Sequence, residues 1–292
     1  MTRARPDIAI IGAGVVGTTL GIAARRAGYP VVAVASRTAA SARKAARLIG
    51  GEPSVCSAAE AAGRAELVLL TVSDDAIAPV AAALAGAGTL RAGTVVAHCS
   101  GALAAEVLAP LAAAGASVAS MHPLQTFPSV LVAVDRLPGC HCFCEGDSAA
   151  LSVVMQLAGD LGCVPIELAG DRKALYHAAA CMACNYLATL QEAAIATAVL
   201  AGIDAEPARS ALAPLVAATV DNIAAFGPQR ALTGPIARGD VNTVATHLAA
   251  LDATDGDLAE LYRQLGRRTV RLARKAGRID EATARRLMDA LR

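Results

Sequence analysis

Short apolar runs alternate with longer amphipathic stretches over the first half of the chain. Four of these runs, at residues 8–11, 31–35, 66–72 and 94–97, are mostly apolar. Runs of this kind predict parallel strands buried on both faces of a sheet, and an apolar-periodic stretch at residues 15–27 predicts a helix after the first run. Strands that alternate with helices indicate a doubly wound α/β domain.

The second half of the chain has a different pattern, in which alanine-rich stretches with a helical period follow one another. We expect one long helix at residues 172–200. Five further helices are expected at residues 205–226, 230–237, 241–251, 256–276 and 281–291. The sequence therefore predicts an α/β domain over residues 1–168 and an all-helical domain for substrate binding and dimerisation over residues 169–292.

The first apolar run leads directly into GAGVVG, a GxGxxG motif at residues 12–17. In a turn that binds a dinucleotide, Gly12 makes the turn, Gly14 lets the backbone approach a pyrophosphate, and Gly17 lets the helix pack closely on the strand. The N-terminus of the helix then offers unpaired N–H groups to the phosphates. A glycine-rich turn alone is a weak indicator, but the flanking strands and helix support a nucleotide site.

The end of the second predicted strand indicates which nucleotide would bind. A site for NAD or FAD usually has an acidic residue here, which binds the ribose 2′-hydroxyl. This chain instead has Ser36 and Arg37, with Arg43 and Lys44 on the next predicted helix. A hydroxyl and a guanidinium suit the additional 2′-phosphate of NADP, although Arg37 could also be a solvated loop residue. We therefore predict NADP as the cofactor.

Polar segments follow three successive predicted strands. They are TVSDDAI at residues 71–77, HCSGAL at residues 98–103 and MHPLQTF at residues 121–127. Open α/β sheets bind ligands at the carboxyl ends of their strands, so we expect a site here, although aspartate at a helix start is also an ordinary capping residue. Ser100 and His122 are predicted to bind substrate. The predicted cofactor-binding residues are Gly12, Ala13, Gly14, Val15, Val16, Gly17, Ser36, Arg37, Thr71, Val72, Ser73, Asp74 and Ser100.

Taken in order, these segments resemble a Rossmann-type oxidoreductase family of largely unassigned activity. That family is related to pyrroline-5-carboxylate reductases, ketopantoate reductases and β-hydroxyacid dehydrogenases. The resemblance continues through KALYHAAACMACNYLATL at residues 173–190 and GPIARGD at residues 234–240, so it spans nearly the whole chain. It implies an NADP-dependent oxidoreductase with a Rossmann fold and does not imply a particular substrate.

Polar residues gather on one face of the long predicted helix. Lys173, Tyr176 and His177 occupy positions i, i+3 and i+4, and Asn185 falls two turns beyond His177. Polar side chains on so apolar a helix must find partners or line a cavity, so these four are the predicted catalytic residues. In β-hydroxyacid dehydrogenases the resembling helix carries a lysine with an asparagine four residues later. Here His177 stands in the asparagine position, which leaves open whether Lys173 or His177 is the proton donor.

Eight cysteines raise the question of metal or redox chemistry. Cys140, Cys142 and Cys144 alternate along a predicted strand at residues 139–146, where same-face side chains are spaced about 7 Å apart. We interpret them as buried core residues and not as metal ligands. Cys181 and Cys184 form a CxxC inside a helical pattern, and we interpret them as core residues too. No metal site is predicted.

Composition and charge narrow the class of protein. The chain is 55% hydrophobic and 2% aromatic, with no tryptophan and a net charge of +1, which argues against a nucleic-acid partner. Proline, glycine and polar residues interrupt its apolar stretches, so no membrane span is expected. The first strand leaves no room for a signal peptide, so we expect a cytoplasmic protein with reduced thiols. The helical half has more apolar surface than one copy would cover, which predicts a homodimer.

The predicted reaction is hydride transfer from NADPH to a small 2-keto acid, with ketopantoate as the first candidate. The site is expected in the cleft between the domains, where Arg238 would bind a carboxylate through its planar guanidinium, although solvation of its loop explains Arg238 equally well. One alternative is an imine reductase of the pyrroline-5-carboxylate reductase type. A flavin-binding protein is opposed by the missing acidic residue, and a nonenzymatic NADP-binding sensor is the remaining alternative.

Overall fold

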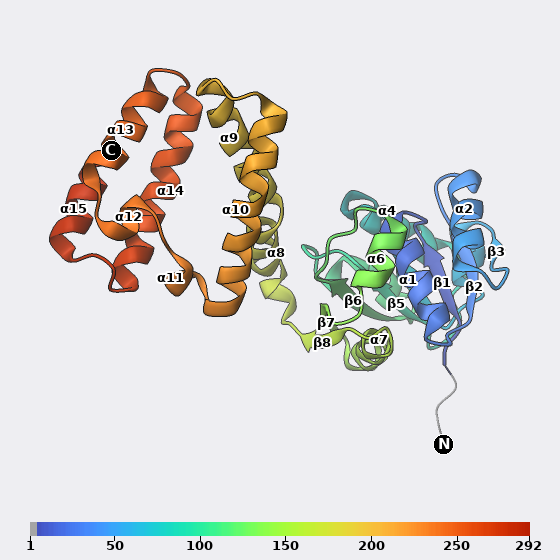
Figure 1. Cartoon of the computed structure of the whole chain (residues 1–292). Helices are drawn as coiled ribbons and strands as arrows, with labels where there is room; N and C mark the ends of the chain where they lie inside the picture. Colours follow the sequence, from blue (N-terminus) through green and yellow to red (C-terminus); the bar gives the residue numbers. More distant parts are fainter. Residues whose placement is uncertain (1–4) are drawn as a thin grey trace. The chain divides into compact units, whose positions relative to one another are not determined.

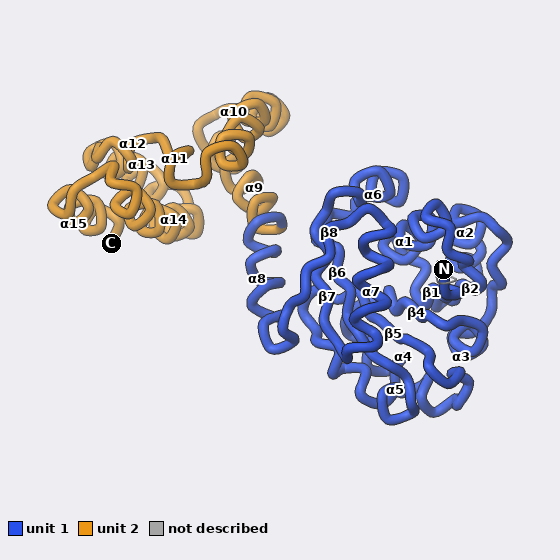
Figure 2. Tube along the Cα trace, turned by 90° about the horizontal axis from the view of Figure 1, so that it is seen from below, with its two compact units in different colours: residues 1–184 blue, residues 185–292 orange. Residues whose placement is uncertain are grey.

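The computed structural model describes residues 5–292 of the chain. It divides into two compact units after Cys184 (Figure 2). The boundary predicted at residues 168/169 lies before helix α8 (Lys173–Ala183), which the structure assigns to unit 1. This difference has a physical reason, because Lys173 at the start of α8 is 2% exposed and its contacts are with the sheet of unit 1.

Unit 1 is built on an eight-stranded sheet with the order β3-β2-β1-β4-β5-β6-β7-β8 (Figure 1). All neighbouring strands are parallel except β6 and β7, which pair antiparallel. The strands are β1 (Ile8–Ile11), β2 (Val31–Ala35), β3 (Ser54–Val55), β4 (Leu67–Leu70), β5 (Val95–His98), β6 (Ser117–Pro123), β7 (His141–Gly146) and β8 (Val164–Glu167). The doubly wound α/β fold predicted from the sequence is confirmed.

Helices cover both faces of this sheet, and strand β1 shows how the two cores arise. Ile8 and Ile10 pack into one core, and the alternate residues Ala9 and Ile11 pack into the other. The first core includes residues of α1 (Val15–Arg26), α2 (Ala39–Ile49) and α7 (Ser148–Asp160), and α6 (Val130–Arg136) packs on α1. The second includes residues of α3 (Ala58–Ala62), α4 (Asp74–Ala87), η1 (Ala105–Leu108) and α5 (Ala109–Ala113).

Cys142 and Cys144 of strand β7, and Cys140 just before it, are core residues, as predicted. Cys142 and Cys144 are fully buried and Cys140 is 8% exposed, all three in the first core. The interpretation of the CxxC as core is wrong for Cys184, which is exposed, while Cys181 is partly buried. The exposure of Cys184 follows from its position at the end of α8, where the chain leaves unit 1.

The single long helix predicted over residues 172–200 is interrupted. A 3₁₀ turn, η2 (Gly170–Arg172), precedes α8, and the helix is interrupted by a turn at Cys184, with φ −116° and ψ −68°, before α9 (Asn185–Leu200) begins. Neither glycine nor proline stands at this break, so the hydrophobic period carries no signal for it.

Unit 2 is all-helical, as predicted. Its core is formed by α12 (Pro235–Arg238), α13 (Val241–Asp252), α14 (Gly256–Lys275) and α15 (Glu281–Ala290). The helix predicted at residues 230–237 is replaced by α11 (Pro228–Ala231) and α12, because Gly234 adopts φ +92° between them. In the described part of the chain, every helix is too short or too polar to cross a lipid bilayer.

Helices α9 and α10 (Ala205–Phe226) pack on each other but bury few side chains. Ala193 is the buried residue of α9 and Ala208 the buried residue of α10. The large apolar residues that α9, α10 and the turn between them leave exposed are Tyr186, Leu187, Leu190, Val199, Leu200, Ile203, Leu215, Val220, Ile223 and Phe226.

Candidate functional site

The glycine-rich turn between β1 and α1 is held against the end of β4. Gly12 has φ +113°, and a Cβ on it would collide with the backbone of Thr71 and Val72. A Cβ on Gly17 would collide with the carbonyl of Gly12 and the hydroxyl of Thr71. The Thr71 hydroxyl also donates a 2.6 Å hydrogen bond to the Gly12 carbonyl, so these positions accept only glycine and form a rigid turn.

The space in front of this turn suits a dinucleotide phosphate. A Cβ on Gly14 would meet no heavy atom of the described chain within 4 Å, in contrast to Gly12 and Gly17. Gly14 is also the N-cap of α1, and the first turn of that helix has no acidic residue. Open space at a helix N-terminus, where N–H groups lack helical partners, is the geometry that binds phosphate.

The end of β2 carries the residues predicted to select NADP. Ser36 is partly buried and Arg37 is exposed, directly after the strand. Thr38 then caps α2, because its hydroxyl accepts a 3.2 Å hydrogen bond from the Ser41 N–H. The guanidinium of Arg37 is therefore presented to solvent at the carboxyl edge of the sheet, and its contact with a 2′-phosphate stays a prediction.

A row of polar side chains crosses the carboxyl edge of the sheet on three neighbouring strands. His98 on β5 lies directly opposite Ser120 on β6, which lies directly opposite Glu145 on β7. Side chains that lie opposite each other on neighbouring strands point to the same face of the sheet. Val96 and Val118, two residues before His98 and Ser120, pack into the core that includes α4 and η1, so the row lies on that face. His98 and Ser120 are fully buried. The sheet register therefore brings together three polar groups that are far apart in the sequence.

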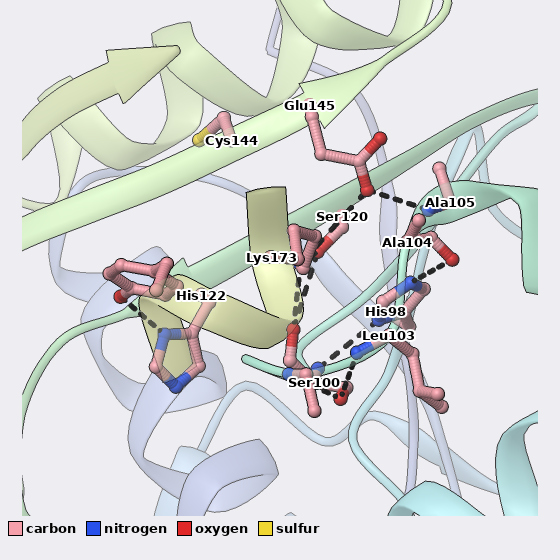
Figure 3. Close-up of polar contacts among 12 residues, drawn as sticks. His98, Ser100, Leu103, Ala104, Ala105, Ser120, His122, Cys144, Glu145 and Lys173 are labelled. Carbon is pink, nitrogen blue, oxygen red and sulfur yellow. Dashed lines mark hydrogen bonds and ion pairs between the residues drawn. The ribbon is translucent and has the colours of Figure 1, made fainter. Parts of the chain in front are cut away.

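Lys173 enters this row from α8 (Figure 3). Its Nζ donates a 2.8 Å hydrogen bond to the Ser100 carbonyl and a second, short one to the Ser120 hydroxyl, and it lies 4.0 Å from Oε1 of Glu145. Burial lowers the pKa of Lys173, and the carboxylate of Glu145 opposes that shift. The three N–H groups of the ammonium thus all face oxygen atoms of unit 1.

The loop from Ser100 to Ala105 is pinned to the same cluster. The Ser100 N–H donates a 3.2 Å hydrogen bond to Nδ1 of His98, so Nε2 of that ring carries the proton that bonds the Ala104 carbonyl at 3.2 Å. Burial, with Lys173 nearby, lowers the pKa of His98 to about 4, so its ring is neutral at pH 7. At the other end of the loop, Glu145 Oε1 accepts a 2.6 Å hydrogen bond from the Ala105 N–H.

Two imidazoles lie over Gly101 in this loop. A Cβ on Gly101 would collide with Nδ1 of His177 and Nε2 of His122, and the two ring centroids are 5.7 Å apart. Nδ1 of His122 forms a 2.8 Å hydrogen bond with the Tyr176 hydroxyl. Burial lowers the pKa of His122 to about 4, so this ring is neutral at pH 7. Nδ1 of His177 is buried and has no hydrogen-bond partner within the described chain.

The structure brings several of the predicted site residues together in unit 1, namely Ser100, His122, Lys173, Tyr176 and His177. Asn185 begins α9 and Arg238 ends α12, both in unit 2, so the structure does not join them to this cluster. Arg238 donates a 3.0 Å hydrogen bond to Asp240, as expected for a solvated loop. Their catalytic and substrate-binding roles stay predictions.

Sequence analysis did not select His98, Ser120 or Glu145 as functional residues. Glu145 lies on the same strand as the cysteines, and the strand was interpreted from the cysteines alone. Glu145 is one residue after Cys144, so its side chain must point to the opposite face of the sheet. That alternation was a signal available in the sequence. The opposition of His98, Ser120 and Glu145 depends on strand register, which no local pattern reports.

Two protein-family models match the chain. One is a Rossmann-like domain over residues 1–123, and the other is a domain of unknown function, DUF2520, over residues 140–269. A search of curated proteins found none that matches.

Solved structures share the fold over nearly the whole chain. A candidate NADP oxidoreductase from Bacteroides fragilis is 24% identical, with a TM-score of 0.72 over 93% of this chain and 98% of its own. A reductive aminase from Aspergillus terreus in complex with NADPH and ethyl-5-oxohexanoate is 19% identical, with a TM-score of 0.66 over 99% and 100% of the two chains. An imine reductase from Pseudomonas sp. is 20% identical, with a TM-score of 0.62 over 99% and 100%. The two family models thus match successive parts of the chain.

Proposed function

We propose that this protein is an NADPH-dependent oxidoreductase that reduces a small carbonyl compound or imine. The observation that carries the proposal is the joint presence, on one edge of one sheet, of a turn shaped for a dinucleotide and of two imidazoles over Gly101. Ligands of open α/β sheets bind at this edge. The fold shared with a structure holding NADPH, and with an imine reductase, supports the same reaction class.

The proposed cofactor is held by backbone and by charge. The N–H groups of the first turn of α1 face the open space at Gly14 and would bind the pyrophosphate. Ser36 and Arg37 would bind the 2′-phosphate, since a guanidinium forms strong paired hydrogen bonds with phosphate oxygens. NADPH, when bound, supplies the hydride.

The residues of the chain would manage the proton and the developing negative charge. If the Tyr176 hydroxyl donates to Nδ1 of His122, then Nε2 of His122 carries a proton and points toward Gly101. Nδ1 of His177 reaches the same place and has no hydrogen-bond partner among the residues that the structure describes. Two imidazole nitrogens that converge on one point can bind a substrate oxygen or nitrogen. His122, whose ring is neutral at pH 7, would donate a hydrogen bond from Nε2, and His177, when protonated, would transfer the proton. This favours His177 as the proton donor, with Lys173 behind it.

A small 2-keto acid is the first substrate class to test, with ketopantoate as the first compound. The resemblance to ketopantoate reductases and β-hydroxyacid dehydrogenases supports this choice. A specific observation favours a neutral imine as the second class. The Lys173 side chain is 2% exposed and its ammonium faces Ser100, Ser120 and Glu145, so it is not presented to a substrate carboxylate.

The test is a screen of NADPH oxidation against small 2-keto acids and cyclic imines, each with the purified protein and a Gly12→Ala variant. Gly12→Ala is a matched control because a Cβ there collides with the backbone of Thr71. Turnover that is lost in the variant would support the proposal. Tight NADPH binding with no turnover on any compound would instead favour the nonenzymatic sensor.

We also propose that the protein forms a homodimer through α9 and α10. These helices expose nine large apolar side chains and bury one alanine each. A hollow of about 740 Å³ lies on the same unit, lined mainly by residues of α9 and α10 that include Ile195, Val199 and Leu200. Apolar surface this extensive usually marks a partner site, and a two-fold homodimer is the commonest arrangement. A mass of 29.3 kDa by light scattering at micromolar concentration would contradict the dimer.

A further inference from the structure

Glu145 and Lys173 hold opposite ends of the loop that carries Gly101. Glu145 Oε1 accepts the 2.6 Å hydrogen bond of the Ala105 N–H, while Nζ of Lys173 donates its 2.8 Å hydrogen bond to the Ser100 carbonyl (Figure 3). The two charged groups lie 4.0 Å apart, with side chains 12% and 2% exposed. The loop is therefore clamped by one ion pair whose members come from β7 and α8.

We propose that Glu145 is a positioning residue that keeps Lys173 in its cationic form and thereby fixes the loop of residues 100–105 under His122 and His177. The effect on turnover rests on the function proposed above. The effect on the charge of Lys173 and on the loop does not depend on that function. The inference about Glu145 and the proposed function can therefore be contradicted separately.

The surroundings of Lys173 leave the cation dependent on Glu145. A buried ammonium is costly unless it is paired and hydrogen-bonded. The titratable groups that act on it besides Glu145 are His98, Cys99, His122, Cys144 and Asp74. The two histidines are neutral because burial lowers the pKa of each to about 4, and burial raises the pKa of Cys99 to about 12. Asp74 is exposed at the start of α4 and is the weakest of the groups that act on the pKa of Lys173.

The protonated form of Lys173 is the form that fits these contacts. Its ammonium faces three acceptors, which are the Ser100 carbonyl, the Ser120 hydroxyl and the Glu145 carboxylate. A neutral amine has only two N–H groups and a lone pair, so the Ser120 hydroxyl would have to turn toward the lone pair and give up the 3.4 Å hydrogen bond that it donates to the Ser100 carbonyl. Replacing Glu145 by glutamine removes the negative charge that lies 4.0 Å from Nζ of Lys173, and a neutral amide oxygen accepts from the Ala105 N–H less strongly than a carboxylate oxygen. The loop should then be held more weakly at both ends.

The chain allows a direct test because it has only three lysines, Lys44, Lys173 and Lys275. Labelling lysine with ¹³C at Cε and titrating by NMR follows each amine separately, with assignment by Lys44→Arg and Lys275→Arg. In Glu145→Gln we expect the pKa of Lys173 to fall by about 1–3 units, the usual effect of one nearby opposite charge. Glu145→Asp should keep most of the wild-type pKa, because the charge remains.

A second measurement reports on the loop. Hydrogen exchange at the Ala105 amide should accelerate about tenfold or more in Glu145→Gln and less in Glu145→Asp, because its acceptor is weakened. The matched control is Glu167→Gln, an exposed glutamate on the neighbouring strand β8. That control should change neither Lys173 nor Ala105. If Glu145→Gln does not fold, Glu145→Asp alone decides, because a shorter side chain must still alter the exchange of the Ala105 amide.

The outcome separates this inference from the proposed function. An unchanged Lys173 titration in folded Glu145→Gln, or unchanged Ala105 exchange in Glu145→Asp, would overturn the inference whatever the substrate proves to be. Once a substrate is known, Glu145→Gln should lower kcat and shift the pH profile while NADPH binding stays within about twofold. A shifted titration with an unchanged kcat and pH profile would show that the clamp has no part in the reaction and would overturn its positioning role.

Discussion

Lys173 in unit 1 is 2% exposed, whereas Leu215 on α10 in unit 2 is 64% exposed. The usual distribution of charged and apolar groups is inverted in both places, but for different reasons. The lysine has Ser100, Ser120 and Glu145 as partners within its own unit. The leucine and its apolar neighbours on α9 and α10 are not covered within unit 2.

Alanine-rich helices occur in both regions, so composition does not explain the contrast. In unit 1, α1 buries seven of its twelve residues against the sheet. In unit 2, α10 buries one residue of twenty-two. A helix beside a sheet finds a continuous apolar surface to cover, while α10 packs on α9 and on the short helix α11. The proposed homodimer would cover the apolar side chains that α9 and α10 expose.

The largest expected effect concerns the buried charge. Lys173→Met should lower turnover of a confirmed substrate by about 10²–10⁴-fold, because it removes the cation from the centre of the site. NADPH binding, measured by fluorescence titration, should change little, since Gly14, Ser36 and Arg37, which are proposed to bind its phosphates, are not among the partners of Lys173. Lys275→Met on α14 is the matched control and should behave as the wild type.

His177→Ala tests whether His177 is the proton donor. If His177 is the donor, kcat should fall by about the same 10²–10⁴-fold. If His177 only orients other groups, the loss should be a few-fold. Unchanged turnover in both Lys173→Met and His177→Ala would show that this face of α8 has a structural role and no part in the mechanism.

The next effect concerns the exposed apolar surface. Leu215→Glu should weaken the dimer about 100-fold or more, because a carboxylate would be buried without a partner in the interface. Sedimentation velocity should show the dimer converting to a monomer as the protein is diluted. Leu48→Glu on α2, where the leucine is 44% exposed, should leave the dimer intact. Equal behaviour of the two variants would place the interface elsewhere.

A smaller effect is expected at the cofactor. Arg37→Ala should weaken NADPH binding about 10–100-fold through the loss of a charge-assisted contact with the 2′-phosphate, and NADH binding should hardly change. The control is Arg47→Ala, because Arg47 is an exposed arginine nearby on α2 and should leave the binding of both cofactors unchanged. Equal losses for NADPH and NADH would contradict the assignment of Arg37 to the 2′-phosphate.

The smallest effect is the acid sensitivity of unit 1. His98 and His122 have folded pKa values of about 4, below the ordinary value near 6.5 of the unfolded chain. The unfolded state therefore binds more protons between pH 6.5 and 4, so stability is fully present above pH 6.5 and is lost as the pH falls through this window. The loss should be about 1–2 kcal/mol per histidine at pH 5. Urea unfolding from pH 7 to 4.5 would measure it, and a smaller slope is expected in His98→Gln.

Local patterns were enough for much of the fold. The apolar runs predicted β1, β2, β4 and β5, and the GxGxxG turn was predicted because Gly12, Gly14 and Gly17 each meet a local requirement. The helix over residues 205–226 was predicted with its observed ends. Lys173, Tyr176 and His177 were found because helical spacing places them on one face. Each of these features depends on residues close together in the sequence.

Other features depend on contacts between distant segments. The two-residue strand β3 is defined by its pairing with β2 and has almost no pattern of its own. The row of His98, Ser120 and Glu145 exists only in the register of three strands, so Glu145 was interpreted with its cysteine neighbours. Burial of Lys173 likewise depends on where α8 meets the sheet. Because of this contact, unit 1 ends at Cys184 and not at the predicted residue 168.

The sequence by itself therefore determined most of the helices and strands, the dinucleotide turn and the apolar character of α9 and α10, because backbone geometry and side-chain periodicity act over a few residues. Only the tertiary structure decided which polar groups meet, that Lys173 is enclosed by Ser100, Ser120 and Glu145, and that the two imidazoles converge over Gly101. The physical reason is that hydrogen bonds and charge pairs act over a few ångströms, and only the packing of strands and helices brings such distant residues within that range.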